Sequence, residues 1–163
     1  MDAEETSVIP PKYLQTLKIS GLVLPSWVEK LSELTKITLH KTFLTGGDIK
    51  ILGRLTSLRY LRLWQESICE KTLAFCKDEF QNLMFLVIEC SDITIVNFGK
   101  KSTPELKKIV WNSTGSQTLN GMEKLPSLKE VKLKGNFDLE RVKQAVAANT
   151  NGPILNPDIN SEI

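Results

Sequence analysis

The chain has 163 residues, of which 41% are hydrophobic and 25% charged, and its formal net charge is +2. Residues 1–82 hold 11 basic and 10 acidic side chains and residues 83–163 hold 10 and 9, so the sequence shows no basic stripe of the kind that binds nucleic acid. No apolar run approaches the roughly 18 residues of a membrane span, and we expect a single domain of ordinary soluble composition.

The cysteines and the histidine argue against a metal centre or a catalytic site. Cys69, Cys76 and Cys90 lack C-x-x-C spacing and His40 is the only histidine, a set that does not match the usual zinc ligands. A nucleophilic triad cannot be assembled around one histidine without partners that the sequence identifies. The sequence therefore predicts reduced thiols, no cofactor, no metal and no enzyme activity.

Residues 1–10, which read MDAEETSVIP, are predicted to form a flexible N-terminal segment. The segment is acidic and lacks the apolar stretch of a secretory signal. Together with the odd number of cysteines, this indicates a cytoplasmic or nuclear location.

One spacing, L-x-x-L-x-L, recurs six times along the chain in steps of 20, 24, 25, 23 and 22 residues. Steps of about 20–29 residues with this spacing are typical of leucine-rich repeats, in which a short strand turns every second side chain to the core. We predict an α/β leucine-rich-repeat solenoid over residues 11–136, curved, with about six repeats, a parallel concave sheet and an irregular or short-helical convex side. The triads are Leu14/Leu17/Ile19, Leu34/Ile37/Leu39, Leu58/Leu61/Leu63, Leu83/Leu86/Ile88, Leu106/Ile109/Trp111 and Leu128/Val131/Leu133.

The connections between these strands differ from one another. Asp48 can cap a short helix through residues 49–52. Residues 70–80 place Leu73, Cys76 and Phe80 at helical spacing, whereas residues 93–98 are predicted to be extended.

A capping helix is predicted over residues 137–152. Asp138 is the expected N-cap, Leu139, Val142 and Val146 form an apolar stripe, and Gly152-Pro153 ends the helix. Solenoids need an element that covers the apolar edge of the last repeat. Residues 153–163 are predicted to be a frayed tail.

The strand residues that point away from the core form the concave face, where repeat solenoids bind their partners. In the middle repeats this face gathers aromatic and charged side chains, which dominate the energies of protein interfaces. Two alternatives are that the aromatic residues only pack on one another across strands, or that the register is misassigned. His40 is interpreted as a solvated residue at the edge of this face. The predicted protein-binding residues are Lys36, Tyr60, Arg62, Trp64, Phe85 and Glu89.

The order of several segments resembles the leucine-rich repeats of plant nucleotide-binding immune receptors, especially the cereal coiled-coil type. The resemblance covers about residues 10–155. In that family the repeats follow a coiled coil and a nucleotide-binding module, but this sequence has no G-x-x-x-x-G-K-[ST] loop and hence no assignable nucleotide site. The matching segments are PPKYLQTLKISG, LPSWVEKLSELTKITL, LTSLRYLRL, FQNLMFLVIE, TPELKKIVW and MEKLPSLKEVKL.

The resemblance implies a non-catalytic interaction module of plant innate immunity, monomeric in isolation. Its partner would be a pathogen effector, or the nucleotide-binding module of an immune receptor that the repeats regulate. Two alternatives are an extracellular receptor ectodomain and the substrate-reading repeats of a ubiquitin-ligase adaptor. Against the ectodomain stand the unpaired cysteines and the missing signal sequence, and against the adaptor stands the lack of a recognisable F-box or RING segment.

Overall fold

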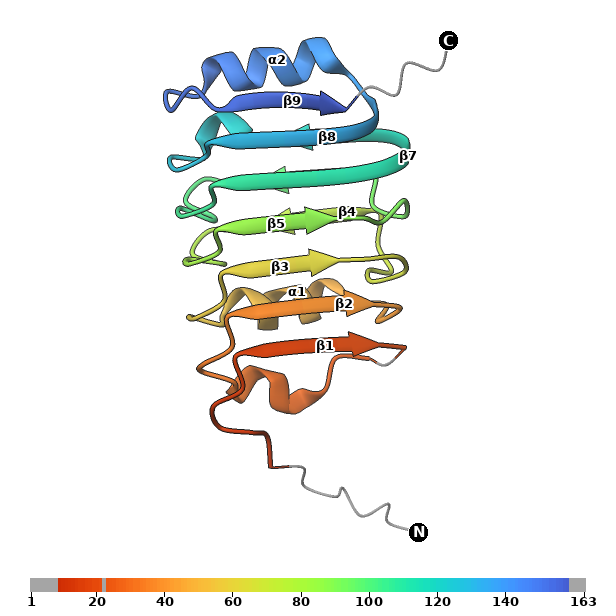
Figure 1. The fold of residues 1–163 in the computed structure, drawn as a ribbon, viewed down its shortest axis with the longest axis vertical. Helices are drawn as coiled ribbons and strands as arrows, with labels where there is room; N and C mark the ends of the chain where they lie inside the picture. Colours follow the sequence, from red (N-terminus) through yellow and green to blue (C-terminus); the bar gives the residue numbers. More distant parts are fainter. Residues whose placement is uncertain (1–8, 22, 159–163) are drawn as a thin grey trace.

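A computed structural model describes residues 9–21 and 23–158. The chain winds into a solenoid in which parallel strands stack one above the other (Figure 1). This arrangement confirms the predicted fold class. The concave sheet consists of β1 (Thr16–Ser20), β2 (Lys36–His40), β3 (Tyr60–Leu63), β5 (Phe85–Ile88), β7 (Lys108–Asn120), β8 (Glu130–Phe137) and β9 (Ile154–Asp158).

The predicted core positions are buried because the strands stack in register, except for Leu14 and Leu17 of the first repeat, which are half-buried. Leu61 pairs with Ile37 on one side and Leu86 on the other, and Leu86 pairs with Ile109. All four side chains are completely buried. Apolar side chains on a strand bury their surface only when the neighbouring strand places its own at the same height. The L-x-x-L-x-L spacing therefore sets both the strands and their register.

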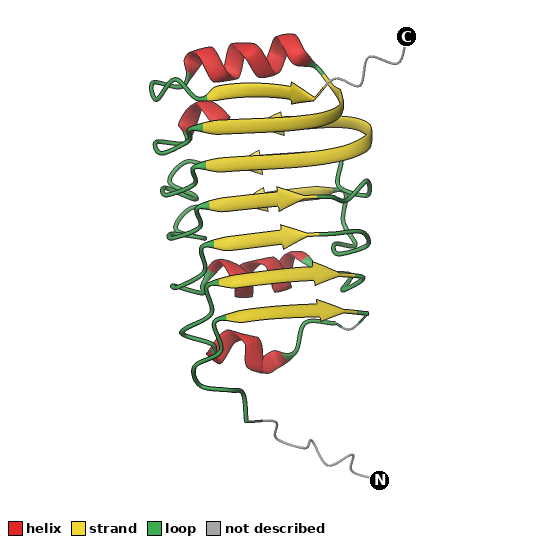
Figure 2. Cartoon of the chain, viewed as in Figure 1, coloured by secondary structure: helices red, strands yellow, loops and turns green. Residues whose placement is uncertain are grey.

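The convex side changes character along the chain (Figure 2). The first two connections are helical: η1 (Ser26–Lys30) and α1 (Gly46–Gly53). In α1, Thr45 and Asp48 form a capping box. Thr45 is therefore the N-cap, and Asp48, the predicted cap, occupies the third position of the helix and accepts a hydrogen bond from the backbone of Thr45.

The later connections form a second parallel sheet. Its strands are β4 (Thr72–Phe75), β6 (Ile95–Phe98) and the end of β7. The helix predicted over residues 70–80 is therefore wrong, since Leu73 and Phe75 alternate with exposed neighbours and Cys76 is exposed. The extended segment predicted at 93–98 is confirmed by β6.

Aromatic residues fill the space between the two sheets. The ring of Phe75 stacks on Phe98 with centroids 4.9 Å apart and meets Phe80 edge-on at 5.0 Å. All three are at most 2% exposed. Trp111, predicted to belong to the core, is fully buried and packs edge-on against Phe137. The short helix η2 (Met122–Lys124) then begins after Gly121, whose φ of 87° brings the backbone against the carbonyl of Phe98.

The C-terminal region departs from the prediction in two respects. The capping helix ends at Ala148 with Asn149 as its C-cap, before Gly152-Pro153, and part of the predicted tail is a strand. The expected N-cap is confirmed, because Asp138 accepts a hydrogen bond from the backbone of Arg141 at the start of α2 (Leu139–Ala148). Val142 of this helix is buried in the core. However, residues 154–158 of the predicted frayed tail form β9, a seventh concave strand paired with β8.

The position of Pro157 explains why a strand that contains proline can join the sheet. Ile154 donates its backbone N–H to the carbonyl of Lys129, so the even-numbered residues of β9 direct their backbone groups toward β8. Pro157 is odd-numbered and therefore directs its nitrogen to the opposite, open edge of β9, where no hydrogen bond is lost. Residues 1–8 of the predicted flexible N-terminal segment and residues 159–163 of the predicted tail lie outside the described part of the chain.

Candidate functional site

The six predicted binding residues lie together on the concave face of β2, β3 and β5 or directly after these strands. The register pairs Lys36 with Tyr60 and Tyr60 with Phe85, which places the three side chains in one row. Arg62 follows one step further along β3, and Trp64 and Glu89 come just after their strands. This register excludes the register error considered above. The group, here called the middle patch, comprises Lys36, Tyr60, Arg62, Trp64, Phe85 and Glu89.

The first row of the middle patch joins a cation to two rings. Lys36 Nζ lies 4.7 Å from the centroid of the Tyr60 ring, and the Tyr60 and Phe85 rings are 6.5 Å apart and tilted by 41°. The Tyr60–Phe85 contact is the cross-strand packing that the alternative interpretation predicted. It leaves Phe85 38% exposed, so a large part of the ring remains available for contact.

The second row centres on an ion pair. Arg62 Nε donates to Glu89 Oε2 at 2.7 Å, and Arg62 Nη2 lies 2.6 Å from the same oxygen. The guanidinium carbon also lies 5.3 Å from the centroid of Trp64. Arg62 is therefore held between a carboxylate and an indole, which fixes a long side chain that would otherwise be mobile.

Two residues outside the predicted set complete the surroundings of Trp64. The His40 ring lies 4.8 Å from the indole, and its Nδ1 is 2.9 Å from Ser20 Oγ. Lys18 Nζ reaches to 5.8 Å above the indole from the first strand. The interpretation of His40 as merely solvated is wrong, because the residue is half-buried against Trp64. Both residues occupy outward positions, so their position in the repeat was the signal that could have found them.

The charges on the concave face are not balanced, in contrast to those along the sequence. Its outward positions from β1 to β8 carry six cations and two carboxylates, Glu89 and Glu130. Both carboxylates are already paired, Glu89 with Arg62 and Glu130 with Lys108 at 2.9 Å. The face is thus positive overall. The cations are Lys18, Lys36, Arg62, Lys108, Lys132 and Lys134.

The pair at Glu130 also changes the acidity of that group. The hydrogen bond from Lys108, which lies at Glu130 Oε2, lowers the pKa of the Glu130 carboxyl below its ordinary value of 4.5, and Asn156 of β9 donates a bond of 3.0 Å to the other oxygen, Oε1. Glu130 thereby links three neighbouring strands. These contacts position charge at the C-terminal end of the concave face.

A polar hollow adjoins the middle patch. It measures about 290 Å³ and lies beside Trp64 and Glu89, with Ser91, Asn112 and Lys134 on its other sides. Such a lining offers hydrogen-bond donors and acceptors to a partner side chain seated next to the indole.

The described residues hold no group of three or more His, Cys, Asp or Glu side chains arranged to bind a metal ion. Within the same residues, no helix has the length and apolar character to cross a membrane. What the middle patch offers is a contact surface, made of half-exposed rings in a positive setting.

Comparison with known proteins gives two kinds of match. Residues 1–152 match the family described as a leucine-rich repeat region. The rice (Oryza sativa subsp. japonica) disease resistance protein PIK6-NP is 28% identical over 155 residues, which cover 82% of this chain and 15% of the rice protein. These findings confirm the likeness to the repeat regions of plant disease resistance proteins.

A tubulin-specific chaperone E from Drosophila melanogaster is 30% identical over 121 residues, or 71% of this chain and 20% of the chaperone. The chain thus spans no more than a fifth of either relative. No solved structure matches the chain significantly.

Proposed function

The chain belongs to the leucine-rich repeat region family, and from this premise we propose that it is a non-catalytic protein-interaction module of plant innate immunity. The observation that carries this proposal is the middle patch, where three half-exposed aromatic rings and a fixed arginine share one concave surface. Aromatic and arginine side chains of this kind often contribute about 2 kcal/mol or more each to binding. The similarity to a rice disease resistance protein supports the immune context.

The proposed partner is a protein with an acidic, partly apolar surface. Either a pathogen effector or the nucleotide-binding module of an immune receptor meets this description if its contact surface carries carboxylates. Lys18 and Lys36 have no carboxylate within 4.0 Å among the described residues, so they are available to such a surface. Charge complementarity raises the association rate and suppresses unsuitable partners.

The direct test is a binding assay between the purified chain and a coiled-coil plus nucleotide-binding module from a receptor of the family that the sequence resembles. We expect Trp64→Ala and Phe85→Ala each to weaken binding about thirtyfold or more. Tyr13→Ala is a matched control, because Tyr13 is 76% exposed but lies before β1, outside the concave face. Unchanged binding in both patch variants would contradict the proposal.

A second arm tests the charge of the partner. The charge reversal Lys132→Glu combined with Lys134→Glu should weaken binding and reduce its dependence on salt, since long-range attraction is screened within about 10 Å at 0.1 M salt. A single-stranded RNA of random sequence serves as a competitor. Displacement of the protein partner by this RNA at comparable concentration would favour a nucleic-acid surface instead.

A further inference from the structure

The second sheet has an open edge at β4. Strand β6 pairs with β4 on one side, where the carbonyls of Lys71 and Phe75 accept hydrogen bonds from Ile95 and Gly99. Because alternate residues of a strand direct their backbone groups to opposite sides, Thr72 and Ala74 present their N–H and C=O groups to the other edge. No second strand pairs with β4 in the described part of the chain.

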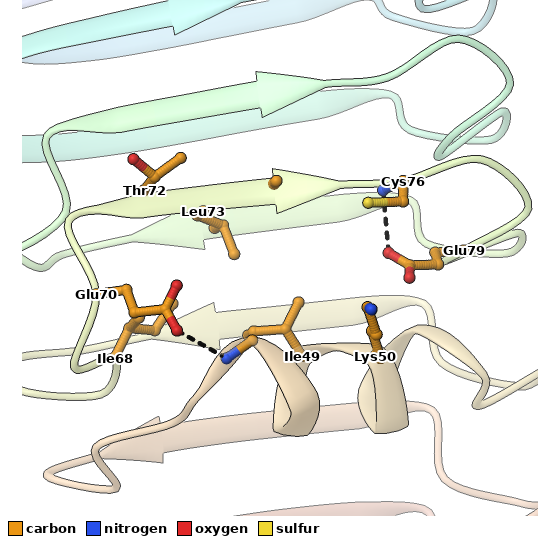
Figure 3. Close-up of a pocket in the computed structure, with 10 residues that line it drawn as sticks. Ile49, Lys50, Ile68, Glu70, Thr72, Leu73, Cys76 and Glu79 are labelled. Carbon is orange, nitrogen blue, oxygen red and sulfur yellow. Dashed lines mark hydrogen bonds between the residues drawn. The ribbon is translucent and has the colours of Figure 1, made fainter.

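A hollow separates this edge from α1 (Figure 3). It measures about 110 Å³ and is lined by Thr72 and Ala74 from the strand. Its apolar lining comes from Ile49, Ile68 and Leu73, each no more than 5% exposed. An open strand edge beside an apolar floor is the arrangement to which extended peptides add as a further strand.

Carboxylates surround this hollow. Glu70 and Glu79 line it, and the neighbouring hollow of about 520 Å³, which shares Ile68 and Glu70, adds Glu66 and Asp92. The cations along both hollows are Lys50 and Lys71. The four carboxylates have no cation within 4.0 Å among the described residues, so their charge is not neutralised within the chain.

Backbone contacts hold two of these carboxylates in place. Glu70 Oε1 accepts a hydrogen bond of 3.2 Å from the backbone N–H of Gly46 at the start of α1, and Glu79 Oε2 accepts one of 3.0 Å from Cys76 (Figure 3). Each group is thus directed by the backbone on one side and free to accept from a ligand with its remaining lone pairs. The hollow is acidic, whereas the concave face is positive.

We propose that the edge of β4 is a second binding site, which takes an extended basic peptide segment of another protein. The peptide backbone pairs with Thr72 and Ala74, its apolar side chains enter the hollow lined by Ile49 and Leu73, and its lysine or arginine side chains meet Glu70 and Glu79. Successive side chains of an extended strand point to opposite faces, so a sequence that alternates apolar and basic residues satisfies both requirements. The site is separate from the middle patch and does not depend on the function proposed for it.

The probe for this site is an acetylated, fluorescein-labelled octapeptide of alternating valine and lysine, followed by fluorescence anisotropy at low salt. We expect saturable binding that weakens as salt is added. The same peptide with glutamate in place of lysine should not bind. A peptide in which every second amide is N-methylated should also fail, because it cannot pair with a strand edge.

Variants of the chain locate the binding. Ala74→Pro removes an N–H that faces the open edge and not β6, a position where proline is tolerated, and it should abolish binding while the circular dichroism spectrum is unchanged. Glu70→Gln combined with Glu79→Gln should weaken binding roughly tenfold. The matched control is Glu105→Gln, an exposed carboxylate outside both hollows.

Three results would overturn the proposal. The first is equal binding, or none, for the lysine and glutamate peptides. The second is retained binding by Ala74→Pro, which would place the peptide at another edge such as that of β1. The third is loss of binding in Trp64→Ala, because that residue belongs to the middle patch and not to this site.

Discussion

Phe75 and Phe85 are the same residue type in the two layers of one solenoid, and their surroundings differ completely. Phe75 faces inward from the convex sheet, is 1% exposed and contacts the rings of Phe80 and Phe98. Phe85 faces outward from the concave sheet, is 38% exposed and touches Tyr60 on one side. The first ring stabilises the fold, and the second is placed where a partner can cover it.

The difference shows how the repeat separates stability from recognition. Inward positions are fixed by packing between the two layers, so a change there disturbs the core directly. Side chains at outward positions of the concave sheet do not contact the other layer, so these positions can carry rings and charges that suit a ligand. Changes at inward positions should therefore lower stability, whereas changes at outward positions of the concave face should alter binding.

The largest expected effect comes from Phe75→Ala. Removal of a buried aromatic ring leaves a cavity, and we expect the free energy of unfolding to fall by about 3–5 kcal/mol. The matched change Phe85→Ala should lower it by less than about 1 kcal/mol, since surface substitutions have small effects. Chemical denaturation followed by circular dichroism measures both. Equal losses for the two variants would contradict the distinction between the buried ring and the exposed ring.

A polar residue in the convex layer should rank second. The Asn149 side chain is 4% exposed and donates to the carbonyls of Met122 at 2.7 Å and Leu125 at 3.0 Å. Asn149→Ala leaves both carbonyls without this donor and should cost about 1–3 kcal/mol. The exposed Asn136 provides the control, and a loss in Asn136→Ala as large as that in Asn149→Ala would contradict the account.

On the concave face, the Arg62–Glu89 pair should contribute less to stability. Its side chains are 37% and 28% exposed, and such pairs contribute about 0–1 kcal/mol. Arg62→Ala should therefore shift the denaturation midpoint only slightly while it weakens partner binding. Arg62→Lys, which keeps the charge but not the planar contact with Trp64, separates the two contributions. A large loss of stability would show that Arg62 belongs to the structural layer.

The smallest effect concerns acidity. Because the pKa of Glu130 is lowered in the folded chain, this carboxylate stabilises the fold above its unfolded pKa, and that contribution is lost as pH falls through the folded value. As the pH is lowered from just above 4.5 to below the folded pKa of Glu130, the free energy of unfolding should decline less in Glu130→Gln than in the unaltered chain. Denaturation curves measured at several pH values test this, and parallel pH profiles would contradict it.

Much of the concave sheet could be predicted because one spacing determines it. Leu61 and Leu86 mark the core and, by alternation, Arg62 and Phe85 mark the outward face. The convex layer could not be predicted equally well. In the short segment 70–80, apolar residues fit a helix and a strand alike, and only the neighbouring β6 decides for β4.

The same limit applies to the ends and sides of the candidate site. Strand β9 lacks the repeat spacing and contains Pro157, so its pairing depends on the edge that β8 offers. Lys18 contacts Trp64 from β1, two strands away, and His40 contacts it from β2, the adjacent strand. Both contacts depend on how far a side chain reaches along the sheet. Such lateral distances arise from stacking and are not encoded in any single repeat.

The most direct test of the separation between the layers is a pair of measurements on Phe85→Ala: its melting temperature and its dissociation constant for a protein partner that the unaltered chain binds. We predict a melting temperature within a few degrees of that of the unaltered chain and binding weakened about thirtyfold, which corresponds to roughly 2 kcal/mol. An unchanged dissociation constant, or a melting temperature lowered as far as that of Phe75→Ala, would contradict it.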